Sequence, residues 1–367
     1  MNILVINWQD WKNPFAGGAE VYLYEVFSRL IKKGHRVMLL CSRGRGQSRY
    51  ECLDGFRIFR IGRRPNFNFV APSALRALLR HHDIDVIIDD LNKIPFYSTV
   101  FTRKRVLPTV MHLFRRTIFR ETNPLAAGYV FVAERLAGKV YGRADFVAIS
   151  HSTKDDLRDI GVRRRIHVVQ SGIPEHYCAG KKKRADDLVV YIGRVKSYKS
   201  IDHFVRAVGL VSKRRRIKAK IVGDGDALND LKSLAQRIDV DVDFTGFVSE
   251  EEKYNTYRTA RVVVQPSIKE GWGLTAIEAQ SCGTPVVCAN SPGLREVVLD
   301  GRTGYRYTYG NIDEMADRIV ELLANKPKWI RFSNEAKKWS RHFSWDLSAQ
   351  RFEEVLKQEA SCPGSTP

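Results

Sequence analysis

Two carboxylates in the second half of the chain could bind hydroxyl groups of a ligand. Glu270 and Glu278 are separated by seven residues, with Gly273 between them. The β-branched run 262–264 indicates a buried strand, and the apolar pattern from residue 274 onward is typical of a helix. A strand, a glycine-bearing turn and a helix start direct free N–H groups and the positive end of the helix dipole toward an anion. This arrangement suits a ligand that carries both phosphates and hydroxyls.

Two cations could add to such an anion site. Arg194 and Lys199 follow the apolar run 188–192 and precede the next helical pattern. An arginine and a lysine at this point would neutralise a diphosphate and stabilise it as a leaving group. The residues alone leave a simpler alternative open, in which an ordinary βα unit carries surface charges on its loops and helix.

The sequence motifs in these segments indicate a protein family more specifically than the residue types alone. E-G-W-G-L-T-A-I-E-A has P-S before it and G-T-P-V-V after it, within Gln265–Asn290. This stretch resembles the E-x7-E signature of the retaining glycosyltransferases of family 4, which have the GT-B fold. Gly193–Asp202 is similar to the G-R-x-x-x-x-K-G-x-D motif of the family, although Ser200 stands where a glycine is usual. Residues 42–85 and 113–141 match the family least.

The resemblance implies a site for the diphosphate of a nucleotide-sugar donor in the second half of the chain. Arg194 and Lys199 would bind the diphosphate, together with the backbone N–H groups of Gly273, Leu274 and Thr275. The resemblance gives Arg194 and Lys199 a catalytic role as well, because they would stabilise the leaving group.

Three further residues would contact the other parts of the donor. By the same resemblance, Glu270 would bind hydroxyls of the sugar near the reaction centre, and Glu278 would hold the ribose hydroxyls. Val248 follows a Gly-Phe pair, and similar family segments hold the nucleobase through backbone groups.

The first half of the chain would provide the acceptor side. Gly17 and Gly18 lie between a strand at Ile3–Asn7 and a helix, where they would let the acceptor and the donor phosphate approach. His112 follows a strand at Val106–Met111 directly, and family members often carry a histidine there that contacts the donor sugar and the reacting centre, which gives His112 a catalytic role by the resemblance. A structural histidine at a strand end is the alternative.

The fold expected from the resemblance is α/β. The GT-B architecture has two Rossmann-like βαβ domains that face a central cleft, and a C-terminal helix crosses back to the first domain. We expect an acceptor-binding domain over residues 1–178, a nucleotide-sugar-binding domain over 186–342, and the returning helix over 343–360. The basic run 181–184 would be a solvated linker between the domains.

The reaction is expected to need neither a cofactor nor a metal. The donor substrate would be a UDP- or GDP-linked sugar. The resemblance implies that the acceptor hydroxyl attacks from the face that the leaving phosphate occupies, with this phosphate as the base. Asp224 and Asp226 form a D-x-D pattern that invites a metal site. We interpret it instead as the turn that opens a βα unit.

The charge of the chain indicates an anionic partner. The 367 residues contain 61 Lys and Arg against 41 Asp and Glu, a formal net charge of +20. The excess is larger before residue 180 than after it. A basic, solubility-related surface is the alternative. We expect peripheral contact with an anionic membrane through the N-terminal domain, and no nucleic acid.

The segment 113–141 bears on the identity of the acceptor. Its first part interleaves aromatics with arginines, and the part from Leu125 onward is apolar but too short to span a bilayer. It could lie at a membrane interface, or it could be a loop and a core helix. A lipid-linked glycan or glycolipid acceptor and a soluble acceptor both stay open. Asp89 and Asp90 follow a strand at 86–88, at the carboxyl end beyond which ligands of such sheets bind. They could face the cleft, but we favour a solvated turn.

The remaining features concern location and competing functions. The chain enters its first strand at once, and its six cysteines form no C-x-x-C pair, so we expect a cytoplasmic protein with free thiols. Peripheral contact would then be with the inner face of the cell membrane. A non-catalytic scaffold on an anionic surface would have lost the donor residues, yet these are present. A phosphorylase would need a cofactor lysine setting that the chain lacks.

Overall fold

The structure is a computed structural model that describes most of the chain. The described residues are 1–92, 94–174 and 187–360. The expected linker at 181–184, the domain boundary between 178 and 186, and Cys178 and Cys362 lie outside them.

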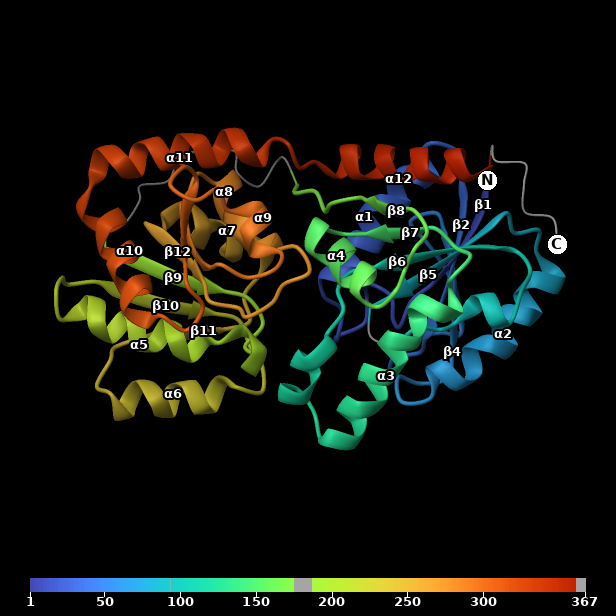
Figure 1. The fold of residues 1–367 in the computed structure, drawn as a ribbon, viewed down its shortest axis with the longest axis horizontal. Coiled ribbons are helices and arrows are strands. Elements are labelled where there is room, and N and C mark those ends of the chain that lie inside the picture. The colour runs from blue at the N-terminus through green and yellow to red at the C-terminus, as the bar shows by residue number, and fades with distance from the viewer. Residues whose placement is uncertain (93, 175–186, 361–367) are drawn as a thin grey trace. The chain divides into compact units, whose positions relative to one another are not determined.

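The chain divides into two compact units, as the GT-B expectation requires. The first unit combines Met1–Gly172 with the segment that begins at Trp345, and the second is Ile173–Ser344. The last helix, α12 (Trp345–Ala360), therefore belongs to the first unit, where Figure 1 shows it alongside α1 (Gly18–Lys32). The contact is aromatic, with the Phe27 and Phe352 rings 5.2 Å apart between centroids.

The first unit is built on a mostly parallel sheet. Its described strands have the order β3-β4-β2-β1-β5-β6-β7-β8, and β3 alone among them pairs antiparallel to its neighbour. The strands are β1 (Asn2–Ile6), β2 (Arg36–Ser42), β3 (Tyr50–Leu53), β4 (Phe56–Ile61), β5 (Val86–Leu91), β6 (Arg105–Val110), β7 (Phe146–Ala148) and β8 (Ile166–Val168). The central strands are buried on both faces, as their continuous β-branched and aliphatic runs predict.

Helices cover this sheet and connect its strands. Besides α1 and α12 they are α2 (Phe67–His81), the short 3-10 turns η1 (Ser98–Val100) and η2 (Arg115–Arg120), α3 (Pro124–Val140) and α4 (His151–Asp159). The helix α2 begins six residues before Ser73, where the sequence placed its start. The reason is that Phe67 is fully buried and packs against Trp8 and Phe96.

The second unit repeats the same design with parallel strands. Its described strands lie in the order β11-β10-β9-β12-β13-β14. They are β9 (Leu188–Ile192), β10 (Lys218–Val222), β11 (Asp243–Gly246), β12 (Val262–Gln265), β13 (Val286–Ala289) and β14 (Gly304–Tyr307). The order reverses at β9, which pairs with both β10 and β12. Ligands of such sheets bind beyond the carboxyl ends of the strands at this reversal.

Helices cover both faces of the second sheet, as Figure 1 shows. The helices α5 (Ile201–Ser212), α6 (Leu228–Arg237) and α10 (Ile312–Ala324) pack together on one face. The other face carries α7 (Glu250–Thr259), α8 (Leu274–Ser281) and α11 (Lys326–Ser340). The short η4 (Ser197–Lys199) and α9 (Leu294–Val297) complete the described elements.

Asp89 and Asp90 do not lie in a solvated turn, so that expectation is wrong. The strand β5 continues through Leu91, and the two residues are 0% and 2% exposed. Asp89 accepts hydrogen bonds from the Tyr141 hydroxyl (2.5 Å) and the Ser98 N–H (3.0 Å). Burial raises the pKa of both carboxyls, and for Asp90 the neighbouring Glu20 and Asp89 raise it further.

Candidate functional site

The second unit brings most of the expected donor residues to one edge of its sheet. The loops after β9, β11 and β12 carry Arg194, Lys199, Val248 and Glu270, and α8 begins after the β12 loop. Because β9, β10, β11 and β12 are parallel, these loops all lie at the carboxyl edge.

Lys199 and Glu270 form an ion pair at this edge. The Lys199 Nζ atom lies 2.5 Å from Glu270 Oε1, and the side chains are 12% and 14% exposed. Burial is the largest single influence and opposes the charge on each side chain, but the charge of the partner, the hydrogen bond between the two and the other neighbouring groups together outweigh it. The pKa of Lys199 is therefore raised and the pKa of Glu270 is lowered. At neutral pH the site thus presents an ammonium and a carboxylate side by side.

Arg194 adds a second cation to this pair. Its side chain is exposed, and no ion pair within the described ranges engages it. Burial has the largest influence on the pKa of Glu270, and the Lys199 charge has the next. The positive charge of Arg194 lowers this pKa further, so the guanidinium lies within electrostatic reach of Glu270. The guanidinium is therefore available to a ligand.

The Arg194 loop is held in place by the glycines of the D-x-D segment. The Val195 N–H donates to the Asp224 carbonyl (2.9 Å), and a Cβ atom on Gly223 would lie 1.9 Å from the Gly193 carbonyl oxygen. A Cβ atom on Gly225 would lie 2.0 Å from the Val195 carbonyl oxygen. Glycine is needed at 223 and 225 for this close crossing of two loops, which explains the segment without a metal.

The start of α8 provides unused backbone donors. Gly273 adopts φ 99°, and no side chain caps the helix. The N–H groups of Gly273, Leu274 and Thr275 donate to no hydrogen bond of the residues that the structure describes. These are the three N–H groups that the sequence predicts for the diphosphate, and the helix dipole adds to their attraction for an anion.

A glycine that the sequence did not single out fixes Glu270. The Glu270 N–H donates to the Pro292 carbonyl (3.1 Å), and a Cβ atom on Gly293 would lie 2.4 Å from the Glu270 carbonyl oxygen. Gly293 adopts φ 80°, which only glycine takes readily. The segment 291–294 therefore positions the carboxylate through the backbone.

Glu278 lies in the second turn of α8 and faces α7. It is 5% exposed. Its carboxylate accepts a hydrogen bond from the Tyr257 hydroxyl (3.0 Å) and forms an ion pair with Lys253 Nζ (3.1 Å). Lys253 and Tyr257 were not found from the sequence, because their spacing on α7 gave no sign that they face Glu278. A carboxylate has about four lone-pair directions, so the Glu278 carboxylate can accept further hydrogen bonds.

The loop before α7 offers an exposed aromatic side chain. Val248 is partly buried, and its neighbour Phe247 is 88% exposed. Ser249 then caps α7 through its hydroxyl. The loop therefore presents backbone groups beside an open aromatic face.

In the first unit, Gly17 and Gly18 lie at the start of α1. The Gly17 N–H donates to Glu20 Oε2 (2.7 Å), which is one half of a capping box, since glycine has no side chain to cap α1. A Cβ atom on Gly18 would meet no atom within 4 Å, and its φ is not in the left-handed region. The fold does not need a glycine at position 18, whereas a ligand that approaches the backbone closely would need one.

His112 lies in the loop after β6, at the same carboxyl edge as Gly17. Its ring packs edge-on against Phe114, with centroids 4.4 Å apart. The N–H groups of Phe114 and Arg115 both donate to the buried Glu134 carboxylate of α3 at 2.7 Å. Glu134, which the sequence did not identify, therefore holds the His112 loop against α3.

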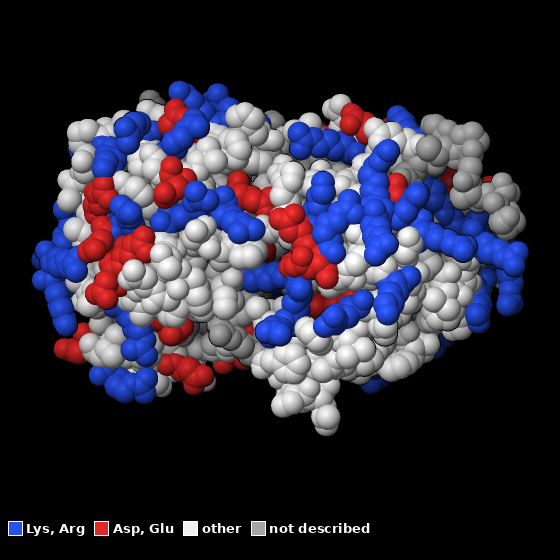
Figure 2. Space-filling view, in the orientation of Figure 1, with Lys and Arg blue, Asp and Glu red and all other residues white. Residues whose placement is uncertain are grey.

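The helix α3 has two faces of different character. Ala127, Ala133, Ala137 and Glu134 are buried, so part of the helix belongs to the core. Leu125, Tyr129, Val132 and Leu136 follow one another at helical spacing and are 89%, 50%, 54% and 45% exposed. We call these four residues the apolar stripe. The projecting end of α3 is correspondingly white in Figure 2, with Lys and Arg side chains above it.

Two classes of site are not found. No helix within residues 1–92, 94–174 and 187–360 is long and apolar enough to cross a bilayer. In the same part of the chain, no three His, Cys, Asp or Glu side chains form a group that could hold a metal ion.

The structure thus groups Arg194, Lys199, Glu270 and the α8 start in the second unit. It places Gly17, Gly18 and His112 at the sheet edge of the first. Comparison with family models agrees with this division. Residues 16–177 match the model of Glycosyltransferase Family 4, and residues 178–339 match that of Glycosyl transferases group 1. The chain belongs to the family 4 glycosyltransferases with the GT-B fold.

Relatives and solved structures agree with the family. A D-inositol 3-phosphate glycosyltransferase of Corynebacterium aurimucosum is 30% identical over 59% of this chain, but the match spans about half (52%) of that relative. An uncharacterized glycosyltransferase of Methanocaldococcus jannaschii is 24% identical over 97% of this chain and 98% of its own length. The fold resembles sucrose-phosphate synthase of Thermosynechococcus elongatus, with TM-score 0.83, 19% identity and coverage of 98% and 99%. It also resembles Anabaena HepE solved with UDP-glucose, with TM-score 0.78, 18% identity and coverage of 98% and 100%.

Proposed function

We propose that this protein transfers a sugar from a nucleotide-diphosphate sugar to a hydroxyl group of an acceptor. The observation that carries the proposal is the Lys199–Glu270 pair, with Arg194 within electrostatic reach and three unused N–H groups at the α8 start. The cations and N–H groups suit a diphosphate, and the carboxylate suits sugar hydroxyls. The names of the relatives and the UDP-glucose bound to HepE support a UDP-sugar as the first donor to test.

Each residue has a role in this proposal. Arg194 and Lys199 neutralise the diphosphate and stabilise it as it leaves, and Glu270 binds the sugar. Glu278 shares its carboxylate between the α7 side chains and the ribose. In the first unit, Gly18 lets the acceptor approach the backbone, and His112 contacts the reacting groups.

The proposal includes retention of configuration without a metal. Glu270 is engaged by Lys199 and is therefore a poor covalent nucleophile. We propose that the acceptor hydroxyl attacks on the side of the leaving diphosphate, whose oxygen takes the proton. Two cations and the helix start replace the charge that a divalent ion would supply.

The first experiment compares donors and a matched pair of variants. Hydrolysis of UDP-, GDP- and ADP-glucose by the full chain is measured with and without EDTA. We expect turnover with one donor base, unaffected by EDTA, and a fall of about 10²–10³ in kcat/KM for Glu270→Gln. Glu251→Gln, on the exposed side of α7, serves as the control. No turnover with any donor would favour a non-catalytic scaffold instead.

We also propose that the acceptor is associated with a membrane. The apolar stripe on α3 supports this, because four aliphatic or aromatic side chains at helical spacing are exposed in a unit rich in arginine. Such a face can insert into the headgroup boundary while nearby cations bind anionic lipids. The proposed location is the cytoplasmic face of the cell membrane.

Vesicle co-sedimentation tests the membrane part separately. The wild-type chain should bind vesicles of phosphatidylcholine with phosphatidylglycerol. The affinity of Leu125→Ser/Val132→Ser for these vesicles should be lower by roughly tenfold or more, since each apolar side chain contributes about 1.5–3 kcal/mol on burial. Val100→Ser/Ile330→Ser changes two other exposed apolar residues, which lie outside the stripe, and should bind normally. Equal binding by both variants, or no binding at low salt, would favour a soluble acceptor.

A further inference from the structure

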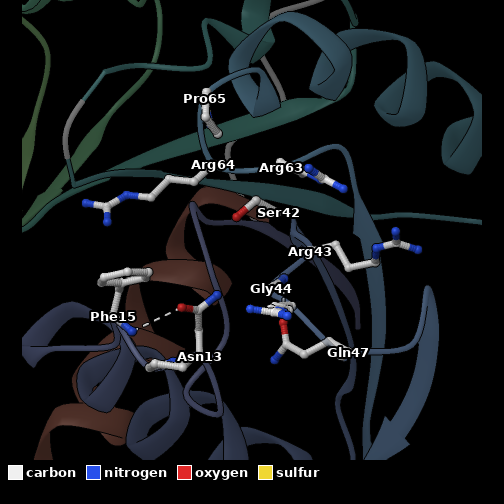
Figure 3. A pocket seen from close by; sticks show the side chains of 12 residues that line it. Asn13, Phe15, Ser42, Arg43, Gly44, Gln47, Arg63, Arg64 and Pro65 are labelled. Carbon is white, nitrogen blue, oxygen red and sulfur yellow. Dashed lines mark hydrogen bonds between the residues drawn. The ribbon is translucent and has the colours of Figure 1, made fainter.

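A basic pocket lies at the carboxyl edge of the first sheet. It has a volume of about 680 Å³ and is formed by the loops after β1, β2 and β4 (Figure 3). The three loops contribute Asn13–Phe15, Ser42–Gln47 and Arg63–Pro65. We call it the arginine pocket. Because β1, β2 and β4 are parallel neighbours, these loops meet although 50 residues separate Asn13 from Arg63.

The cations of this pocket have no carboxylate partners. Arg43, Arg45, Arg63 and Arg64 line it, and no ion pair of the described residues engages any of the four. No Asp or Glu is among its lining residues. Four arginines along one hollow without a lining acid make its electrostatic potential positive, which favours an anion there.

Two carboxylates of this unit, those of Asp10 and Glu51, are engaged by an arginine that does not line the pocket. Arg60 is fully buried, and its Nε atom lies 2.6 Å from Asp10 Oδ2. Arg60 also pairs with Glu51 at 2.8 Å. These acids neutralise the buried arginine and leave the four lining guanidinium groups uncompensated.

The loop that carries two of the arginines is held in a defined conformation. The Gln47 amide donates to Asp10 Oδ1 (3.1 Å), and its oxygen accepts from the Gly44 N–H (2.8 Å). A Cβ atom on Gly44 would lie 2.7 Å from that oxygen, and Gly46 adopts φ 78°. The segment 43–47 is therefore a structured turn rather than a loose basic loop.

We infer that the arginine pocket binds a phosphate or diphosphate group of the acceptor substrate, an inference that rests on the proposed function. Guanidinium groups bind phosphate oxygens in pairs, and several together suit a group with two or more charges. The volume exceeds that of one phosphate and leaves room for part of a sugar or polyol. Phe15, with Arg64 over its ring at 4.9 Å, provides an apolar wall for that part.

The position of the pocket fits an acceptor rather than a donor. Its Asn13–Phe15 wall lies on the same loop as Gly17 and Gly18, where we propose that the acceptor approaches. The cations surround one hollow and do not follow a track, which favours a terminal phosphate over a nucleic-acid backbone. A phosphate ester in solution and a lipid diphosphate headgroup share this chemistry.

Titration calorimetry with inorganic pyrophosphate and the full chain tests the inference. Wild type should bind pyrophosphate at two places, the donor site and the arginine pocket. Arg43→Gln/Arg63→Gln should weaken one binding event by roughly tenfold to a hundredfold and leave the other intact. Arg194→Ala/Lys199→Ala should do the reverse.

Matched controls make the result specific. Arg103→Gln/Arg143→Gln removes two exposed arginines of the same unit outside the pocket and should change neither event, although the net charge falls equally. Unchanged binding by Arg43→Gln/Arg63→Gln would overturn the inference and leave the proposed function standing. Pyrophosphate binding that is lost in Arg194→Ala/Lys199→Ala tests the donor site independently of the arginine pocket. A failure of the inference can therefore be told apart from a failure of the proposed function.

A second arm identifies the source of the phosphate. Phosphatidylcholine vesicles are prepared with and without a polyprenyl diphosphate. Extra retention that depends on the diphosphate and is lost in Arg43→Gln/Arg63→Gln supports the pocket with a lipid-linked acceptor. Pyrophosphate binding without extra retention supports the pocket with a soluble phosphate ester. If Arg43→Gln/Arg63→Gln changed the result in neither arm, the inference that the arginine pocket binds phosphate would be contradicted.

Discussion

The two units place charge differently at the carboxyl edges of their sheets. In the second unit Lys199 and Glu270 form a mostly buried pair, with the pKa of Glu270 lowered and that of Lys199 raised. In the first unit the arginine pocket has four cations and no acid among its lining residues, and no ion pair within residues 1–92, 94–174 and 187–360 engages the buried Asp90. A paired site suits a ligand with both hydroxyls and phosphates, whereas an unpaired one suits a purely anionic group.

The first prediction tests the paired site and has the largest expected effect. Lys199→Ala removes one cation from the diphosphate and leaves Glu270 buried without a partner. We expect kcat/KM to fall by about 10²–10³, as when one electrostatic donor to a transition state is lost. Steady-state kinetics with the active donor measure this.

The control for Lys199 lies three residues earlier on the same loop. Lys196 pairs with the exposed Asp226, so Lys196→Ala should keep kcat/KM within about twofold. A Lys199→Ala/Glu270→Ala variant removes the unpaired charge. If it recovered full activity, Lys199 would serve only to neutralise Glu270.

The second prediction concerns the buried acids. Burial, Glu20 and Asp89 raise the pKa of Asp90, so folding binds a proton that the unfolded chain releases above about pH 3.9. Stability from this group is present at low pH and is lost as pH rises toward the folded pKa. Asp90→Asn should raise the free energy of unfolding at pH 7, because the amide is neutral without binding a proton.

Glu270 should show the opposite dependence. Its lowered pKa gives stability that is present above about pH 4.3 and is lost as pH falls. Urea unfolding at pH 4, 5.5 and 7 separates the two: the gain from Asp90→Asn should grow with pH and vanish near pH 4. A gain that stays constant with pH would show that Asp90 is not the group responsible.

These predictions differ in how much the sequence could foresee. Glu270, Gly273 and Glu278, the residues expected to bind the donor, lie within nine positions, so their spacing and the surrounding motif single them out in the sequence. The two-unit α/β fold followed from the same motifs and from the strand runs. Residues that reach the site from elsewhere were missed: Lys253, Tyr257 and Gly293 contact Glu278 or Glu270 only through tertiary packing.

The acceptor side was less predictable for the same reason. The sequence shows Arg43, Arg45, Arg63 and Arg64 as scattered charge, and only the order of parallel strands brings their loops to one pocket. Asp89 and Asp90 were misplaced because β5 runs three residues further than its apolar part. The partner that makes this possible for Asp89 is Tyr141, 52 residues away.

The third prediction uses glycines to separate ligand approach from folding. A Cβ atom on Gly18 or on Gly128 would meet no atom within 4 Å, and both residues lie in helices of the first unit. Gly18→Ala and Gly128→Ala should both keep or slightly raise the melting temperature. Only Gly18→Ala should raise the acceptor KM, by about tenfold if one contact is lost. Equal KM values would remove Gly18 from the acceptor site.

The last prediction has the smallest effect and compares strained residues beside the two sites. Ser200 follows Lys199 with φ 51°, and Arg115 lies near His112 with φ 52°. A left-handed residue other than glycine costs roughly 1–2 kcal/mol. The Ser200 hydroxyl partly offsets this through its 2.9 Å hydrogen bond with Tyr309, which is worth about 0.5–1.5 kcal/mol.

Ser200→Gly should therefore change the free energy of unfolding by less than about 1 kcal/mol, because relief of strain and loss of the hydrogen bond oppose each other. Tyr309→Phe breaks the same bond without relieving strain and should destabilise the wild type but not the Ser200→Gly variant. Urea unfolding of the two single variants and the double variant gives the coupling. Zero coupling would mean that the hydrogen bond does not hold Ser200, and the family's usual glycine would then be the more stable choice at this turn.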